Sequence, residues 1–142
     1  MEYIAINYFA VIVAAVAYMV IGSLWYGPVF GKIWMGYMNM TPESIKKMPL
    51  TVWQAMIGGF VTALLMAYVL AHIIGMSQFV FGDLGIMSGI QSAFWVWLGF
   101  VLTTQASSYL WEGKPLGHLI LNGANTFVSL MVMASIIVLW PW

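Results

Sequence analysis

Four long apolar runs dominate the chain, at about residues 4–26, 51–74, 86–109 and 116–140. Each run reaches the roughly 20 residues that an α-helix needs to cross ~30 Å of hydrocarbon. Backbone groups in lipid must be satisfied within their own segment, and the runs are too long for barrel strands of about ten residues. The pattern predicts an all-α, polytopic membrane protein, a bundle of four transmembrane helices that forms a single domain over residues 1–142.

The longest connection, residues 27–50, carries the clearest local signals. Proline lacks an N–H group and disfavours the α conformation of the residue before it, so Gly27-Pro28 is expected to end the first helix. In the segment 41–47, Thr41 suits an N-cap, Pro42 suits the first helical position and two lysines suit the negative end. This segment predicts a short interfacial or cytoplasmic helix between the first two spans, which Pro49 ends.

The residues around the exit of the first helix are typical of a membrane surface. Tyrosine and tryptophan suit the zone where one end of the ring is dry and the other wet, and a lysine cannot lie in hydrocarbon. The stretch 30–37 mixes these residue types and is expected to lie along the interface. The predicted membrane-interface motif consists of Trp25, Tyr26, Phe30, Gly31, Lys32 and Trp34.

Composition supports the membrane assignment and removes several functional classes. Only 6% of the residues are charged and the mean hydropathy is +0.97, whereas soluble domains carry about 25% charged residues. The lipid bilayer is the expected surrounding, and a net charge of zero gives no reason to expect a nucleic-acid partner. The absence of cysteine removes disulfides and thiolate chemistry. Glu2 stands where a signal peptide is usually basic, so the first run is expected to be retained.

The lysines predict the orientation. Lys32, Lys46, Lys47 and Lys114 all fall in the first and third connections, which share one side of the membrane in a four-span chain. The N-terminal segment, the second connection and the C-terminal segment carry none. The positive-inside rule then places the first and third connections in the cytoplasm and both termini outside, in a bacterial cytoplasmic membrane.

Polar residues at helical spacing mark one face of the fourth run. Lipid does not reward polar groups, so this stripe is expected to face other helices. The structural interpretation is interhelical hydrogen bonding, worth on average ~0.6 and at most ~1.7 kcal/mol per contact. The functional interpretation is a polar pocket or a path for a small solute. The candidate residues are His118, Asn122, Asn125, Thr126 and Ser129.

Small and polar residues also align along the other three runs. Small residues let helix backbones approach closely, so these stripes are expected to form the inner faces of the bundle. A substrate-lined channel is the alternative on the same evidence. The stripes are Asn7, Ala14, Tyr18, Gly22 and Tyr26 in the first run; Gly58, Gly59 and Thr62 in the second; and Ser88, Ser92, Trp95, Gly99, Thr103 and Ser107 in the third.

The predicted spans contain no Asp, Glu, Lys or Arg. Ion-coupled pumps and proton relays place such groups at membrane depth, so a proton-coupled exporter is disfavoured. No clustered nucleophile, phosphate-binding glycine loop or metal-ligand set is legible, so no enzyme, metal site or cofactor is expected. The leading interpretation is an accessory or structural subunit that acts through helix–helix contacts in a homo-oligomer or a larger membrane complex. The alternative is a small transporter or apolar-ligand-binding protein that uses the polar stripe of the fourth run.

One sequence pattern resembles a known family. Ala17-Tyr18, then Gly22-Ser23-Leu24-Trp25-Tyr26, Phe30-Gly31 and Trp34, with four spans and a closing Asn-bearing helix, resemble the small bacterial membrane proteins of domain of unknown function 1761. The resemblance covers nearly the whole chain and is sharpest over residues 22–34. It implies a multi-pass bacterial membrane protein without established activity, so no catalytic role is carried over. Members often read Trp-Tyr-Ser-Pro where this chain has Gly27, so any role of that serine is absent.

The lysine asymmetry predicts the location of the C-terminus. A C-terminal alkaline phosphatase fusion, which is active only outside the cytoplasm, should be active, and a C-terminal green fluorescent protein fusion should be dark. As a control, either reporter inserted between Lys47 and Leu50 should give the opposite result. A fluorescent C-terminal fusion with an inactive phosphatase fusion would contradict the orientation.

Overall fold

The computed structural model describes residues 4–141; residues 1–3 and 142, which the predicted domain and the Glu2 argument include, lie outside the described part. The first half of the chain forms α1 (Tyr8–Leu24), a π-helical turn η1 (Trp25–Val29), two short helices α2 (Gly31–Tyr37) and α3 (Pro42–Lys46), and α4 (Val52–Phe81). The second half forms α5 (Ile86–Val96), the π-helical η2 (Trp97–Leu102), α6 (Thr103–Leu110) and α7 (Leu116–Leu139).

The predicted all-α, four-span architecture is confirmed. Between residues 4 and 141 there is no strand. Four helical stretches in this range are long and apolar enough to cross a membrane: Tyr8–Val29, Val52–Phe81, Ile86–Leu110 and Leu116–Leu139. The second of these runs about two turns beyond the predicted residue 74, because residues 75–81 contain no proline and no glycine pair, and the helix ends only at Gly82, which has a positive φ of 83°.

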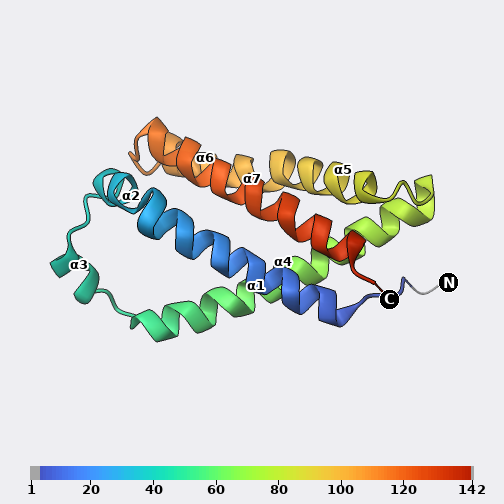
Figure 1. The fold of residues 1–142 in the computed structure, drawn as a ribbon. Helices are drawn as coiled ribbons and strands as arrows, with labels where there is room; N and C mark the ends of the chain where they lie inside the picture. Colours follow the sequence, from blue (N-terminus) through green and yellow to red (C-terminus); the bar gives the residue numbers. More distant parts are fainter. Residues whose placement is uncertain (1–3, 142) are drawn as a thin grey trace.

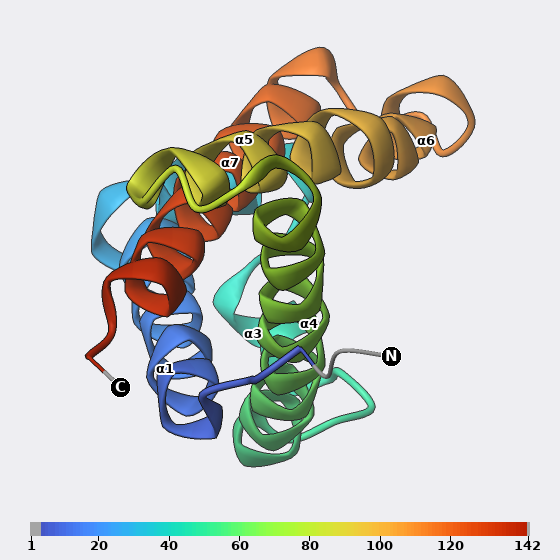
Figure 2. The ribbon, with the colours of Figure 1, turned by 90° about the vertical axis from the view of Figure 1, so that its right-hand side faces the viewer.

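Helix α7 lies at the centre of the bundle. It packs against α1 and α5, while α1 also packs against α4 (Figures 1 and 2). The start of α1, the end of α7 and the α4–α5 turn lie at one end of the molecule, and α2, α3 and the α6–α7 turn lie at the other (Figure 1). The segments that carry the four lysines therefore share one end, which is called the lysine end below.

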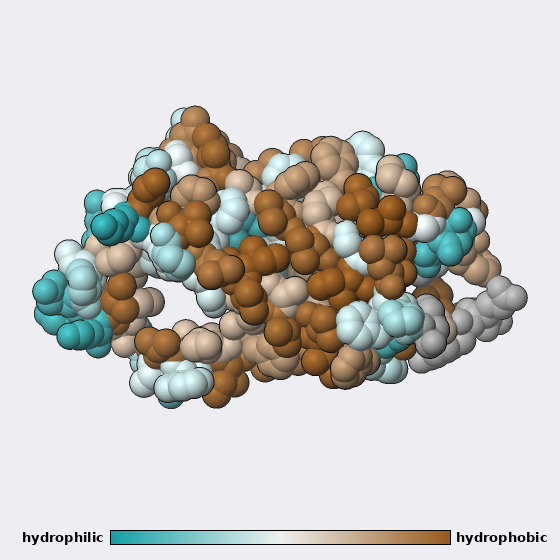
Figure 3. All heavy atoms as spheres, in the orientation of Figure 1, coloured by the Kyte–Doolittle hydropathy of each residue, from teal (hydrophilic) through white to brown (hydrophobic). Residues whose placement is uncertain are grey.

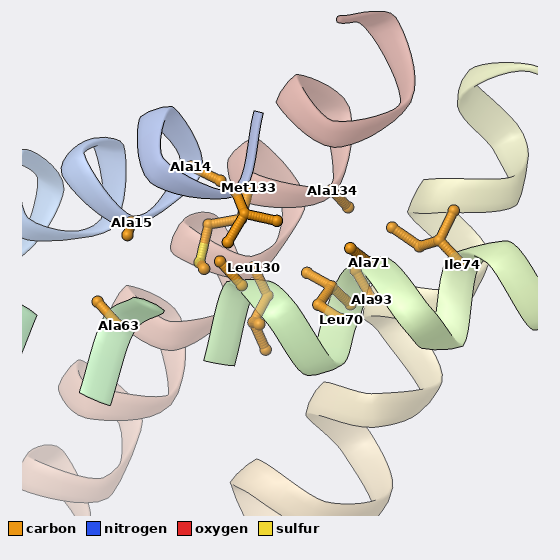
Figure 4. Close-up of a cluster of buried hydrophobic side chains, with 12 residues drawn as sticks. Ala14, Ala15, Ala63, Leu70, Ala71, Ile74, Ala93, Leu130, Met133 and Ala134 are labelled. Carbon is orange, nitrogen blue, oxygen red and sulfur yellow. The ribbon is translucent and has the colours of Figure 1, made fainter. Parts of the chain in front are cut away.

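Alanines make the closest contacts between the helices. Small side chains let backbones approach where lipid supplies no hydrophobic force between helices. Leu130 and Met133 of α7 fill the centre of the cluster beside Ala14 of α1 (Figure 4). The fully buried alanines are Ala10, Ala14 and Ala15 of α1, Ala63 and Ala67 of α4, Ala93 of α5 and Ala134 of α7.

The predicted inner face of the second run was wrong. Gly58 and Thr62 are exposed, and Gly59 is half-buried against Met19. The inner face of α4 is instead Ala63, Ala67, Leu70, Ala71 and Ile74. Two physical reasons explain the difference: the Thr62 hydroxyl donates to the Gly59 carbonyl of its own helix at 2.8 Å and needs no partner helix, and the alanine row offers a smoother close-packing surface.

The predicted stripe of the third run is correct only in its first half. Ser88 and Ser92 are buried, but Trp95, Gly99, Thr103 and Ser107 are exposed. Trp95 lies before the π-helical η2, so η2 does not account for its exposure. The inward row instead starts at the buried Ala93 and continues through the half-buried Trp97, Val101, Gln105 and Ser108, the first three of which lie two positions beyond Trp95, Gly99 and Thr103.

The connection between α1 and α4 follows the local prediction. Gly27 has non-helical torsions inside η1, so the chain kinks at Gly27-Pro28, and the Phe30 N–H donates to the Trp25 carbonyl at 2.8 Å. Thr41 is the N-cap of α3, and Pro42 is its first residue. The Ser44 N–H donates to the Thr41 hydroxyl at 3.2 Å. The helix ends at Lys46, close before Pro49.

The outer surface of the bundle is apolar. Large hydrophobic side chains such as Trp53, Phe81 and Phe100 are more than two thirds exposed, and apolar residues cover the middle of the face shown in Figure 3. Soluble monomers rarely expose contiguous apolar patches of this kind. This surface suits lipid contact.

Gly89 should be essential for the contact between α5 and α7. A Cβ atom at Gly89 would lie 2.8 Å from Val138 Cγ2 and 3.1 Å from the Ala134 carbonyl oxygen. Gly89→Leu should therefore lower the free energy of unfolding by about 1–3 kcal/mol, the usual cost of overpacking. The measurement is unfolding in mixed detergent micelles, with Gly58→Leu as the control because a Cβ there meets nothing within 4 Å. Equal stability of the two variants would show that α5 and α7 are not so closely packed.

Candidate functional site

The polar stripe of α7 lies inside the bundle. His118, Asn125, Thr126 and Ser129 are buried, and Asn122 is half-buried. The stripe faces inward because α7 is the central helix and presents one side to α1 and the other to α5.

One hydrogen-bonded chain crosses from α1 to α7. The Tyr26 hydroxyl donates to Asn122 Oδ1 at 2.6 Å. Asn122 Nδ2 in turn donates to His118 Nε2 at 3.2 Å, which places the imidazole proton on Nδ1. The Asn125 amide also lies within hydrogen-bonding reach of the Tyr26 hydroxyl. Tyr26 thus joins three members of the polar stripe; the sequence placed it both in the interface motif and on the inner face of the first run.

A second link joins α7 to the third span. Trp97 Nε1 donates to the Gly123 carbonyl at 2.9 Å and to Thr126 Oγ1 at 3.2 Å. The Thr126 hydroxyl also lies 3.1 Å from the Gly123 carbonyl. Sequence reasoning missed Trp97 because it followed the row from Ser92 to Trp95, whereas the inward row runs from the buried Ala93 to Trp97. These hydrogen bonds explain why a threonine is buried at position 126 without requiring a ligand.

Three polar atoms of the stripe lack such an explanation. Asn125 Oδ1, Ser129 Oγ and His118 Nδ1 are buried and have no hydrogen-bond partner within residues 4–141. Leaving a buried donor or acceptor unpaired is costly, so such groups are the places where a bound molecule or ion would add most.

A pocket of about 790 Å³ opens beside Asn125 at the lysine end. Its polar residues are Asn125, Tyr18, Tyr26, Ser23 and Thr51, and the rest of its wall is apolar and aromatic. The volume lies within the 300–1,000 Å³ typical of small-molecule sites, and an apolar wall with few polar groups is typical of them too. The remaining lining residues are Met19, Gly22, Trp34, Ile45, Met48, Pro49, Leu50, Val52, Ala55 and Met56.

The pocket exists because α1 and α4 diverge. Buried alanines lie between the two helices up to Ala63, and a Cβ at Gly59 would lie 3.4 Å from Met19 Cε. Beyond that point the two helices separate toward the lysine end (Figure 1), and the space-filling view is hollowed there (Figure 3). Residues 51–58 of α4 are exposed as a result. The segment from α3 to α4 closes part of the opening with Ile45 and Met48.

Other hollows differ in chemistry. A groove of about 470 Å³ between η2 and α7 is lined by Trp97, Leu102 and Phe127 among others, and its exposed surface is almost wholly apolar. A small pocket of about 130 Å³ near Asn7 and Asp83 lies at the opposite end of the bundle. Only the pocket between α1 and α4, among those described, adjoins the polar stripe.

The residues of the predicted interface motif lie in different surroundings: some line the pocket and others do not. Tyr26 and Trp34 form an edge-to-face ring pair with centroids 5.5 Å apart on the pocket wall, and Trp25 packs on Phe30 at 4.7 Å. Gly31 is buried, and its backbone lies so close to Tyr26 that a Cβ there would be 2.7 Å from the Tyr26 carbonyl oxygen. Lys32 is exposed. The interfacial depth of these residues stays a prediction.

Ionisable groups do not gather in the described chain. Within residues 4–141, no three His, Asp or Glu side chains lie close enough to hold a metal ion. The expectations of no enzyme, no metal site and no cofactor stay predictions.

The Tyr26–Asn122 hydrogen bond should contribute to stability. Tyr26→Phe removes the donor and leaves Asn122 Oδ1 unpaired, so the free energy of unfolding should fall by ~0.6–1.7 kcal/mol. The matched control is Tyr109→Phe, because Tyr109 is exposed. Denaturation in mixed micelles measures both. If Tyr26→Phe lowered the free energy of unfolding no more than Tyr109→Phe, the hydrogen bond between α1 and α7 would not contribute to stability.

Comparison with known proteins yields one relationship. No curated protein and no solved structure matches the chain. A family model described as protein of unknown function DUF1761 matches residues 9–138, which spans all four long helices and both short ones. The family expected from the pattern around Gly22–Trp34 is therefore confirmed, and the chain belongs to the DUF1761 family of proteins of unknown function.

Proposed function

We propose that this membrane protein binds an apolar or amphipathic small molecule in the pocket between α1 and α4. The observation that carries the proposal is the position of Asn125: it lines a mostly apolar pocket, is 4% exposed, and has an amide oxygen without a partner in the described chain. A purely structural asparagine would be expected to satisfy that oxygen on a neighbouring helix. A bound molecule with one polar group would satisfy it.

Binding is the first step of either storage or transport of such a molecule. The pocket adjoins the lysine end and the polar stripe, so a ligand would enter from that end or from the lipid between α1 and α4. We place the lysine end in the cytoplasm and both termini outside, in a bacterial cytoplasmic membrane, on the lysine asymmetry alone.

A second candidate is the accessory subunit that acts through helix–helix contacts. The observation that favours it is the exposure of residues 51–58, where α4 diverges from α1 (Figure 1). A helix of a second copy or of another membrane subunit would fill the same wedge. The two candidates differ in what occupies the wedge, which one pair of variants distinguishes.

Gly22→Leu should empty the pocket of its ligand. Gly22 lines the pocket, and a Cβ there meets nothing within 4 Å, so a leucine fills the space without disturbing helix packing. Wild-type protein and the control Gly58→Leu should retain the same small molecule after purification in mild detergent, and Gly22→Leu should lose most of it. Mass spectrometry of the organic extract measures the ligand, and light scattering on the same samples measures the oligomer.

Three results decide between the candidates. Loss of a small molecule with an unchanged oligomer supports the binding function. A smaller oligomer or a lost partner subunit, with no bound molecule in wild type, supports the accessory role. Equal extracts and equal oligomers in all three proteins would contradict both.

A further inference from the structure

The hydrogen bonds that join Tyr26, Asn122 and His118, called the polar relay below, run in one direction. The Tyr26 hydroxyl donates to Asn122 Oδ1 at 2.6 Å, and Asn122 Nδ2 donates to His118 Nε2 at 3.2 Å. An amide has one acceptor end and one donor end, and a neutral imidazole has one nitrogen of each kind. The relay in this direction therefore requires a neutral His118 with no proton on Nε2.

A second proton on His118 is incompatible with this direction. An imidazolium has two N–H donors and no acceptor, so Nε2 could no longer accept from Asn122. If the Asn122 amide turned over, its oxygen would accept from Nε2 and its NH2 group would donate to the Tyr26 oxygen. The two ends of an amide have nearly the same shape, so this reversal requires no movement of α1 or α7.

The reversed relay would end on Asn125. Once the Tyr26 oxygen accepts from Asn122, the Tyr26 hydroxyl must direct its own proton to another acceptor. The Asn125 amide lies within hydrogen-bonding reach of that hydroxyl, and its oxygen is buried and has no partner in the described residues. Reversal would pair this oxygen, which the neutral relay leaves unpaired, and would thereby offset part of the cost of a charge inside the bundle.

His118 lies close enough to the lysine end to exchange a proton there. It is the third residue of α7, and its side chain is 7% exposed. The charged groups that act on it are Glu112 and Lys114 in the turn before α7, which have opposite signs. Of the elements packed on this part of α7, η1 presents Tyr26, α2 presents Tyr37 while its Lys32 is exposed, and the inward row of α6 presents the neutral Gln105 and Ser108.

We infer that His118 is a proton-binding site, and that its protonation reverses the direction of the polar relay through Asn122 and Tyr26 to Asn125. Because Asn125 lines the pocket between α1 and α4, the reversal carries the protonation state of the lysine end into the pocket wall. The inference goes beyond the proposed binding function and does not depend on it, since every group of the relay belongs to the protein.

Nuclear magnetic resonance can follow each member of the relay. Protein labelled with nitrogen-15 in histidine and asparagine is placed in phosphatidylcholine nanodiscs and titrated from about pH 8.5 to about pH 4.5, which brackets the ordinary pKa of histidine. Only His72 and His118, and four asparagines, then give signals. The His118 ring should start with its proton on Nδ1. The His118 nitrogens and the side-chain amides of Asn122 and Asn125 should then shift with one common midpoint.

Three variants separate the relay from a general effect of pH. Tyr26→Phe removes the hydroxyl between the two asparagines, so Asn122 should still follow His118 and Asn125 should not. Tyr109→Phe is the matched control, because Tyr109 is exposed and should leave all three signals coupled. His118→Gln should remove the common midpoint from both asparagines. Asn7, at the opposite end of the bundle, is the internal control and should not share that midpoint.

Several results would overturn the inference. His118 could stay neutral throughout the titration, hold its proton on Nε2 at the start, or titrate without Asn122; each result contradicts the reversal. If Asn125 followed His118 in Tyr26→Phe, the coupling would not pass through the Tyr26 hydroxyl. If Tyr26→Phe did not fold, the agreement or disagreement of the three wild-type midpoints would decide. None of these readouts involves a bound molecule, so the Gly22→Leu extracts test the binding function separately.

Discussion

The hydrogen bond from the Tyr26 hydroxyl to Asn122 holds the first span to the last. Tyr26 lies at the point where α1 kinks through Gly27-Pro28, so the same bond fixes where the α2 and α3 connection begins. From there Tyr37 of α2 contacts Gly117 at the start of α7, where any Cβ would collide with the tyrosine hydroxyl. The Tyr26–Asn122 hydrogen bond and the Tyr37–Gly117 contact together hold the connection between α1 and α4 against α7.

The shape of the pocket depends on where the row of small residues between α1 and α4 ends. Alanines allow α1 and α4 to touch over the half of the bundle that includes Ala14 and Ala67, and lipid provides no force that would close the other half. Because the Tyr26 link keeps α1 on α7, the divergence falls entirely between α1 and α4. The polar stripe of α7 then reaches the pocket through Asn125 alone.

The sequence was sufficient for the features that depend on local chemistry. The presence of four spans, the kink at Gly27-Pro28, the Thr41 cap and the inward direction of Asn125 all follow from hydropathy, proline geometry and the cost of polar groups in lipid. The inward row after Ser92 does not follow, because neighbouring rows of the third run are similar in sequence and tertiary packing selects the row from Ala93 through Trp97. The joining of Tyr26 to Asn122 was also missed, since two residues far apart in sequence met through tertiary packing.

The central claim is that α1 and α4 stand apart in the membrane around a bound molecule. A crystal structure of the protein grown from a lipidic mesophase tests this most directly. The account predicts elongated density that no protein atom explains, bounded by Gly22 and Met56, with its polar end at hydrogen-bonding distance from Asn125. A structure in which α4 has closed onto α1, with Met56 packed on Gly22 and no space between them, would contradict it.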